Sequence, residues 1–208
     1  MTAQETRNRI LDAALRLFNE HGTASISTNH VATEAGISPG NLYYHYRNKE
    51  EIIREMLERM YSAWEGAWFE QSDRGPDIDD LRTLIRMNFQ LLWEFRFFYR
   101  ESTALMLRDP LLKQRHAEMQ ASRLDQQARF YEGFIESGVM RAPTDGQAIP
   151  DLVRISWILA TNWLGFLEEG GIEPTAERMR DGERMILRVF RPYLSEDKGT
   201  DLINEYEP

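Results

Sequence analysis

The most informative polar side chains of this sequence surround a single leucine, Leu42. They are Asn41, Tyr43, Tyr44 and His45. Asn and His can hydrogen-bond with the edges of nucleic-acid bases, whereas Tyr can reach phosphate oxygens or stack on a sugar or a thymine methyl group. If Leu42 faces a core, its neighbours point outward. The residue types therefore predict molecular recognition rather than bond breaking.

The flanking residues predict two short helices joined by a tight turn. The first helix carries an apolar stripe formed by Val31, Ala32 and Ala35. Ser27 or Thr28 can cap its start with a side-chain oxygen, and Gly36 supplies the positive-φ residue that ends it. Pro39 suits the first turn of the second helix. Two such helices joined through a glycine form a helix-turn-helix, whose second helix enters the major groove of DNA.

The segment L-Y-Y-H-Y-R-N-K-E-E-I and the residues before it resemble the tetracycline-repressor (TetR) family. Members carry the pattern A-x-x-A-G-V-S-x-G-x-L-Y-x-H-F-x-x-K-x-x-L. The matching residues here are Ala32, Ala35, Gly36, Ile37, Ser38, Gly40, Leu42, Tyr43, His45, Tyr46, Lys49 and Ile52. Tyr46 replaces the usual Phe and Ile37 the usual Val. The pattern R-x-x-I-L-D-A-A-L-R-L-F-x-E-H-G near the N-terminus also looks like the first helix of the family, so the resemblance spans roughly the first quarter of the chain.

The resemblance implies binding of double-stranded DNA by both helices of the motif and by the start of the next helix. The positions expected to contact DNA are Ser27, Thr28, Asn29, Pro39, Gly40, Asn41, Tyr43, Tyr44, His45 and Lys49. Lys49 matches a family lysine that contacts phosphate, and free N–H groups at the start of its helix would assist it. The alternative is an exposed helical hairpin with ordinary surface residues. For His45, the alternative is packing beneath the helix.

Composition limits the other function classes. The chain has 208 residues, a net charge of −9 and no Cys, which excludes disulfides, zinc thiolate sites and cysteine catalysis. Through Arg54 it contains six cationic and six acidic residues, so the acidic excess lies beyond that point and should face away from phosphate. No apolar run approaches the ~20 residues of a membrane helix, and the polar N-terminus does not resemble a signal peptide. We expect a cytoplasmic, nucleoid-associated protein without membrane contact.

The remaining sequence predicts only helices. Apolar residues recur at helical spacing in residues 4–21, 48–69, 78–98, 111–137, 152–168 and 176–194, with a short helix at 102–107. No segment alternates with period two for long enough to form a strand. The predicted fold is all-α with about nine helices. It comprises an N-terminal three-helix helix-turn-helix domain (1–49), a C-terminal helical bundle for effector binding and dimerisation (50–194) and a disordered acidic tail (195–208).

Two further sites are predicted in the C-terminal bundle. The family usually has an effector pocket for a small molecule, here expected to be apolar or amphipathic and lined by Trp93, Phe97, Arg100, Tyr131, Phe134, Trp157 and Trp163. The alternative is that these side chains form plain core. The last two helices are more apolar than one chain's core requires. They predict a homodimer interface that includes Trp157, Thr161, Leu164, Glu168, Met185 and Val189. The alternative there is burial within the monomer.

Enzymatic functions have little support in the sequence. None of the four histidines pairs with another at the spacing of a zinc helix, and there is no G-x-S-x-G, P-loop or dinucleotide fingerprint. We expect no enzyme activity, no metal and no cofactor. The resemblance implies a homodimeric, ligand-responsive repressor on a palindromic operator, whose helix from Glu50 to Phe69 couples effector binding to the DNA-binding heads. The alternatives are a TetR-fold protein that binds a protein partner, and an activator.

Overall fold

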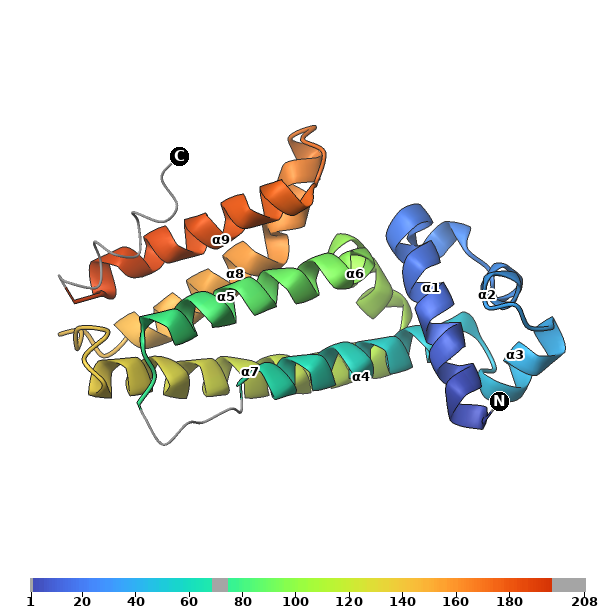
Figure 1. Ribbon diagram of the computed structural model, residues 1–208, viewed down its shortest axis with the longest axis horizontal. Coiled ribbons are helices and arrows are strands. Elements are labelled where there is room, and N and C mark those ends of the chain that lie inside the picture. The colour runs from blue at the N-terminus through green and yellow to red at the C-terminus, as the bar shows by residue number, and fades with distance from the viewer. Residues whose placement is uncertain (1, 69–74, 196–208) are drawn as a thin grey trace. The chain divides into compact units, whose positions relative to one another are not determined.

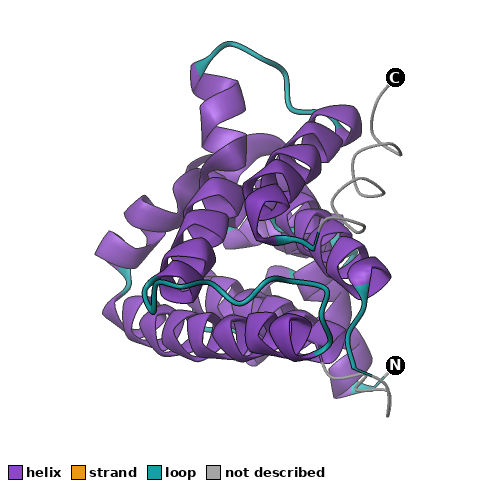
Figure 2. Ribbon diagram, turned by 90° about the vertical axis from the view of Figure 1, so that its left-hand side faces the viewer, coloured by secondary structure: helices purple, strands orange, loops and turns teal. Residues whose placement is uncertain are grey.

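A computed structural model describes residues 2–68 and 75–195, and the regular elements in this part of the chain are helices (Figure 2). The predicted all-α fold of about nine helices is confirmed, because the described residues form nine α-helices followed by one 3-10 turn (Arg191–Tyr193). The α-helices are α1 (Ala3–Ser25), α2 (Thr28–Glu34), α3 (Pro39–His45), α4 (Lys49–Trp68), α5 (Ile78–Glu94), α6 (Arg96–Arg108), α7 (Pro110–Glu136), α8 (Ala148–Glu169) and α9 (Ala176–Phe190). The predicted end of the fourth helix at Phe69 and the predicted tail after Ser195 lie outside the described residues.

The chain divides into two compact units. The first contains residues 1–63 and 95–115, and the second contains residues 64–94 and 116–208. Helices α4 and α7 each contribute residues to both units. The predicted domain boundary after Lys49 rests on motifs rather than on compactness, so it stays a prediction. None of the helices within the described ranges is both long enough and apolar enough to cross a membrane.

In the first unit, α2 packs against α1, and α3 packs against α2 (Figure 1). The buried face of α1 includes Ile10, Ala14 and Phe18, all with no exposed surface, which is the stripe that its sequence predicts. The predicted end of the first helix at Gly22 is confirmed, because Gly22 has non-helical angles, with a φ of 75°. A further helical turn follows this kink, so α1 as a whole reaches Ser25.

Glu101 of α6 stabilises the kink. Glu101 Oε1 accepts a 2.9 Å hydrogen bond from the Thr23 backbone N–H, and Glu101 Oε2 accepts another from the Thr23 hydroxyl. A Cβ at Gly22 would lie 2.9 Å from Glu101 Oε1. The positive φ of Gly22 also disfavours any residue other than glycine at this position. Glycine therefore allows the carboxylate to bind the backbone directly after the kink.

The predicted single helix over residues 78–98 is wrong. Phe95 adopts non-helical angles, so α5 ends at Glu94 and α6 begins at Arg96. The first free N–H groups of α6 are partly satisfied from α1, since Phe97 N–H donates a 3.0 Å hydrogen bond to Asn19 Oδ1. The ring of Phe97 also packs on Phe18, with centroids 5.5 Å apart. This tertiary partner, and not helical periodicity, determines where the chain breaks.

In the second unit, α5, α8 and α9 run side by side (Figure 1). Gly182 of α9 permits this close approach, because a Cβ there would lie 2.3 Å from the Phe89 ring and 2.8 Å from Trp163 Nε1. Trp163 Nε1 donates a 2.9 Å hydrogen bond to the Arg178 carbonyl, which fixes α8 against α9. The ring of Tyr131 on α7 packs edge-on against Phe190 at 4.9 Å.

Candidate functional site

The turn between α2 and α3 is held by backbone hydrogen bonds. Ser27 caps α2 by accepting a hydrogen bond from the His30 backbone N–H. At the other end, the N–H groups of Gly36 and Ile37 each donate a 3.0 Å bond to carbonyls of the last turn of α2. Gly36 has a φ of 63°, so this end is the left-handed glycine cap that the sequence predicts.

The second helix of the motif is fixed by its cap and by one buried leucine. Ser38 accepts a 3.2 Å hydrogen bond from the Asn41 backbone N–H, and Pro39 occupies the first helical position. Leu42 has no exposed surface, and Tyr46, directly after the helix, is 2% exposed. Both ends of this short helix and its inner face are therefore determined by local sequence.

The opposite face of α3 is open. Tyr43 is 52% exposed and Tyr44 83% exposed, while the side chain of Asn41 is also exposed. A methyl group added at Gly40 would meet nothing within 4 Å, so glycine leaves free space at the start of the helix. This surface offers hydroxyl and amide groups next to a place where a backbone or phosphate can approach closely.

The structure places all ten predicted DNA-contact positions on α2, α3, their caps and the first residue of α4. Seven are exposed and three are half-buried: Thr28, His45 and Lys49. Thr28 Oγ1 and the Tyr43 hydroxyl share a 2.9 Å hydrogen bond that joins the two helices of the motif. The ring of His45 stands edge-on to that of Tyr44 at 5.2 Å, so it is not buried beneath the helix.

Lys49 also has an internal role that the sequence does not reveal. Its ammonium donates hydrogen bonds of 2.5 Å to the Thr23 carbonyl and 2.9 Å to the Ile26 carbonyl. These carbonyls lie at the C-terminal end of α1, where helix carbonyls lack intrahelical partners and a cation is favourable. An ammonium has three N–H donors, so one remains for a phosphate.

Several other cations of the first unit pair with carboxylates of the same unit. Arg7 pairs with Glu55, Arg16 with Glu34, Arg59 with Asp12, and Arg54 with Asp109 at 2.5 Å.

Arg47, two residues after α3, is different. Its side chain is exposed and forms no ion pair within the part of the chain that the structure describes. Arg47 was not among the predicted DNA-contact residues, although its position directly after the motif could have indicated a contact with phosphate.

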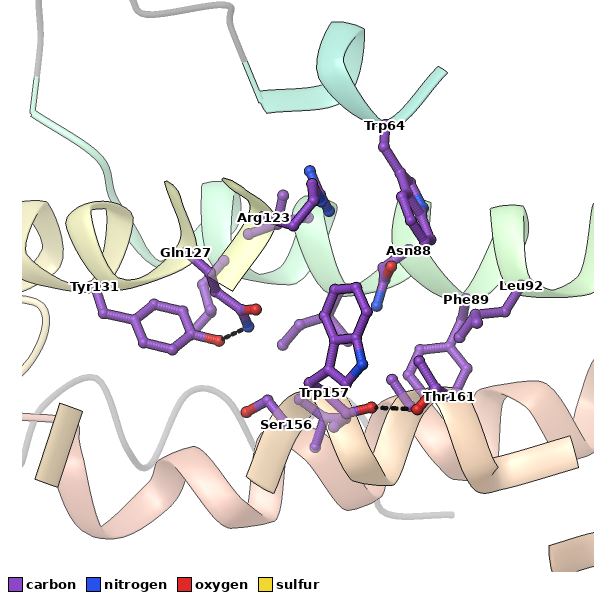
Figure 3. Close-up of a pocket in the computed structure, with 15 residues that line it drawn as sticks. Trp64, Asn88, Phe89, Leu92, Arg123, Gln127, Tyr131, Ser156, Trp157 and Thr161 are labelled. Atoms are coloured by element: carbon purple, nitrogen blue, oxygen red, sulfur yellow. Dashed lines mark hydrogen bonds between the residues drawn. The ribbon is translucent and has the colours of Figure 1, made fainter. Parts of the chain in front are cut away.

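The second unit contains a small cavity of about 40 Å³. One wall is apolar and comes mainly from α5: Leu81, Leu84, Ile85, Phe89 and Leu92. Trp64 of α4, Trp157 and Ala160 of α8, and Ile186 of α9 add further apolar surface (Figure 3). The rings of Trp64 and Trp157 meet edge-on with centroids 6.1 Å apart.

Polar groups line the rest of this cavity. They are Asn88 of α5, Arg123, Gln127 and Tyr131 of α7, and Ser156 and Thr161 of α8. Gln127 Nε2 donates a hydrogen bond to the Tyr131 hydroxyl, as the dashed line in Figure 3 shows. Burial raises the pKa of Tyr131 to about 12, so its hydroxyl stays protonated at neutral pH. The lining of the cavity combines apolar side chains with several polar groups, as ligand sites do.

Only two of the seven predicted pocket residues, Tyr131 and Trp157, line this cavity. Phe97 and Arg100 belong to the first unit. Phe97 is buried there, and Arg100 donates a 2.9 Å hydrogen bond to the Asn19 carbonyl. Trp93, Phe134 and Trp163 belong to the second unit but lie outside the lining. The prediction missed Arg123, Asn88 and Gln127, because polar residues on a helix ordinarily indicate a solvent face.

Some of the predicted dimer residues are exposed, and others are buried within one chain. Leu164 is 2% exposed within one chain, so it has little surface left to give to a partner. Trp157 and Thr161 are half-buried beside the cavity, Val189 is half-buried, and Glu168 and Met185 are exposed. The exposed apolar residues of α8 are ones that the prediction missed: Ile155, Ile158 and Phe166, 47%, 60% and 63% exposed.

The fold and the site together define a helix-turn-helix protein with a second helical unit that contains a cavity. Two family profiles match the chain. One, described as bacterial regulatory proteins of the tetR family, matches residues 10–56, and one, described as bacterial transcriptional repressor, matches residues 54–202. The second match covers more than half of the chain. The protein therefore belongs to the TetR family, whose members are transcriptional regulators.

Individual relatives agree with this assignment. The regulator AcrR of Shigella flexneri is 45% identical over 56 residues, which are 27% of this chain and 26% of AcrR. TtgR of Pseudomonas putida is 29% identical over 92 residues, which are 44% of this chain and 43% of TtgR. Alignments with these curated relatives thus span less than half of their length.

Solved structures match over more of the chain. A TetR-family regulator from Marinobacter aquaeolei VT8 is 29% identical, with full coverage of both chains and a TM-score of 0.88. SmeT, the repressor of a multidrug efflux pump in Stenotrophomonas maltophilia, is 26% identical over 91% of each chain, with a TM-score of 0.63.

Proposed function

We propose that this protein is a DNA-binding transcriptional repressor that acts as a homodimer on a palindromic operator and is released by a small molecule. The observation that carries the proposal is the geometry of α3. Leu42 anchors the helix from inside, while Asn41, Tyr43 and Tyr44 project from its open face. The family profile that covers residues 54–202 describes repressors, which supports the direction of regulation.

Different residues of the motif serve different parts of the DNA. The N-terminal half of α3, from Pro39 to Tyr43, enters the major groove, where Asn41 bonds with a base edge. The hydrogen-bonded Thr28 and Tyr43 hydroxyls bind the sugar-phosphate backbone. Arg47 and the remaining N–H of Lys49 add charge contacts with phosphates, which give affinity and salt dependence but no sequence preference.

Dimerisation uses the exposed apolar face of α8 together with α9. Ile155, Ile158 and Phe166 are spaced by three and eight residues, which places them on one side of the helix. Met185 of α9 is 39% exposed. A methyl group at Gly165 would meet nothing within 4 Å, so a second backbone can approach α8 closely there. A two-fold dimer sets its recognition helices about 34–36 Å apart and requires an operator with matching symmetry.

The cavity of the second unit serves as the effector site. Trp64, which lines it, lies on α4, the helix that begins at Lys49 beside the recognition motif. An effector that binds better to a dimer with separated heads shifts the population away from the operator-binding form. The effect is limited by that differential affinity, typically about 1–3 kcal/mol. A solved structure of SmeT contains triclosan, which supports a small-molecule site in this fold.

Binding of the protein to its own upstream DNA tests the proposal. We expect a dissociation constant of roughly 10⁻⁸ M or lower at physiological salt, and at least ~10³-fold weaker binding to a scrambled fragment of equal length. Fluorescence anisotropy with labelled duplexes measures both values. Equal affinity for the two fragments would leave only charge-driven binding and would refute a specific operator.

A further inference from the structure

The described residues that line the cavity include one positive charge and no negative charge. Arg123 is the ionised side chain, and none of the described residues that line the cavity is Asp or Glu. Arg123 is also one of the few charged residues that are buried in the described chain, with 6% of its surface exposed. A guanidinium stays charged in proteins, so the cavity has a permanent positive charge at its edge.

The surroundings of Arg123 hold this charge in place. Its guanidinium lies 5.0 Å from the centroid of the Trp64 ring, within the range of a cation–π contact. Neutral amide and hydroxyl groups also line the cavity, from Gln127 and Tyr131 on the same helix and from Asn88 on α5 (Figure 3). A guanidinium has five N–H donors, so Arg123 can donate to a ligand oxygen in addition to its present contacts. A carboxylate is attracted to this charge, whereas a cationic ligand is repelled by it.

We infer that the cavity binds an amphipathic monoanion, with a carboxylate at Arg123 and a hydrocarbon body against the apolar wall formed by Leu81, Ile85 and Phe89. This inference rests on the proposed effector role of the same cavity and names the ligand class. Arginine suits a carboxylate because two parallel N–H groups can donate to its two oxygens. The neutral neighbours Asn88 and Gln127 can donate further hydrogen bonds without adding charge.

Ligand entry requires the walls to separate. A cavity of about 40 Å³ holds only a few water molecules, so a chain of eight to ten carbons cannot fit without movement. The edge-on pair of Trp64 and Trp157 is the contact that must open, because both rings line the cavity. Binding should therefore change tryptophan fluorescence. Displacement of Trp64 also moves the end of α4, which gives the ligand a route to regulation.

Three probes with the same ten-carbon chain and different head groups test the charge preference. Decanoate, decanol and decyltrimethylammonium are titrated into the full chain below their micelle thresholds, with tryptophan fluorescence and calorimetry as readouts. We expect saturable binding of decanoate, at least ~10-fold weaker binding of decanol and no binding of the cation. Equal affinity for decanoate and decanol, or tighter binding of the cation, would overturn the inference.

Two arginine substitutions on α7 identify the residue responsible. Arg123→Met should weaken decanoate binding by roughly 10- to 100-fold and leave decanol binding unchanged. Arg129→Met is the matched control, because Arg129 is exposed, pairs with Asp125 and does not line the cavity. Arg123→Lys keeps the charge without the two-pronged geometry and should give an intermediate loss. Equal effects of Arg123→Met and Arg129→Met would exclude Arg123 as the anion-binding group.

This test is independent of DNA binding. Operator binding that persists without any decanoate binding refutes the ligand class and leaves the proposed repressor intact. Decanoate binding without any operator preference refutes the repressor and leaves the anion site intact. If Arg123→Met does not fold, as judged by circular dichroism, the head-group series on the unmodified chain and the Arg123→Lys variant still decide the question.

Discussion

Replacement of Lys49 by methionine should destabilise the first unit, because this lysine connects two elements. Its ammonium donates to the carbonyls of Thr23 and Ile26 at 2.5 and 2.9 Å, and both of these residues are buried. A hydrogen bond to a charged group contributes about 1.5–3 kcal/mol, and less where the ion is partly exposed to water, as Lys49 is. For the two bonds together we expect a loss of about 2 kcal/mol in the free energy of unfolding.

Arg47→Met is the control for this experiment. It removes one cation two positions away, but Arg47 is exposed and its side chain forms no ion pair in the described part of the chain. Its unfolding free energy should stay within about 0.5 kcal/mol of the original protein. By contrast, the loss at Lys49 corresponds to a decrease of roughly 4–8 °C in the thermal midpoint for a chain of this size.

Thermal unfolding followed by far-ultraviolet circular dichroism measures both variants. DNA titrations at several salt concentrations complete the comparison, since loss of one phosphate contact lowers the slope of log K against log salt by about 0.9. Arg47→Met should show this smaller slope with unchanged stability. A Lys49→Met protein as stable as the original, or a strongly destabilised Arg47→Met protein, would refute the assignment of roles to these two cations.

Three further predictions concern the recognition helix, the dimer and pH. Gly40→Ala should leave stability equal or up to about 1 kcal/mol higher, since its methyl meets open space on a helix, yet weaken operator binding, as anisotropy would show. Unchanged operator affinity would remove Gly40 from the interface. Ile158→Glu should convert the dimer to monomer in sedimentation velocity, while the exposed control Glu177→Lys should not; a dimeric Ile158→Glu protein would exclude this face. Burial raises the pKa of Glu183 in the folded protein above its ordinary value of 4.5. The folded state therefore binds the proton more tightly than the unfolded state, and the stability gained from this is complete below pH 4.5. That stability is lost as the pH rises through the pKa of the folded state. The unfolding free energy of Glu183→Gln, measured by urea titration, should therefore increase relative to that of the original protein between pH 4 and pH 7. A difference in unfolding free energy that does not change with pH would contradict this prediction.

The recognition motif was predictable because its determinants are local. The caps Ser27 and Ser38, the positive-φ Gly36 and the inward Leu42 all act within a few residues of their own position. Gly22 itself indicated the end of the first helix, but the break at Phe95 and the contact that holds the chain after Gly22 were not predictable. They depend on Asn19 and Glu101, which are 78 residues distant from their partners Phe97 and Thr23.

The residues that line the cavity were harder to predict than the recognition motif. Aromatic residues correctly indicated α7 and α8, because Tyr131 and Trp157 line the cavity, but Phe97 lies on α6 in the first unit. Periodicity alone could not separate a residue that lines a cavity from one that fills the core beside it, such as Phe134. Arg123 was overlooked because a charged residue on a polar helix usually faces water, and only the packed structure shows that it is buried.

Footprinting on the DNA upstream of the gene tests the central claim most directly. A dimer with two α3 helices in successive major grooves should protect two inverted half-sites whose centres lie about 10 base pairs, or a multiple of one helical turn, apart. Tyr43→Ala should abolish the protection without dissociating the dimer. A footprint without two-fold symmetry, or protection that Tyr43→Ala leaves unchanged, would contradict recognition by the open face of α3.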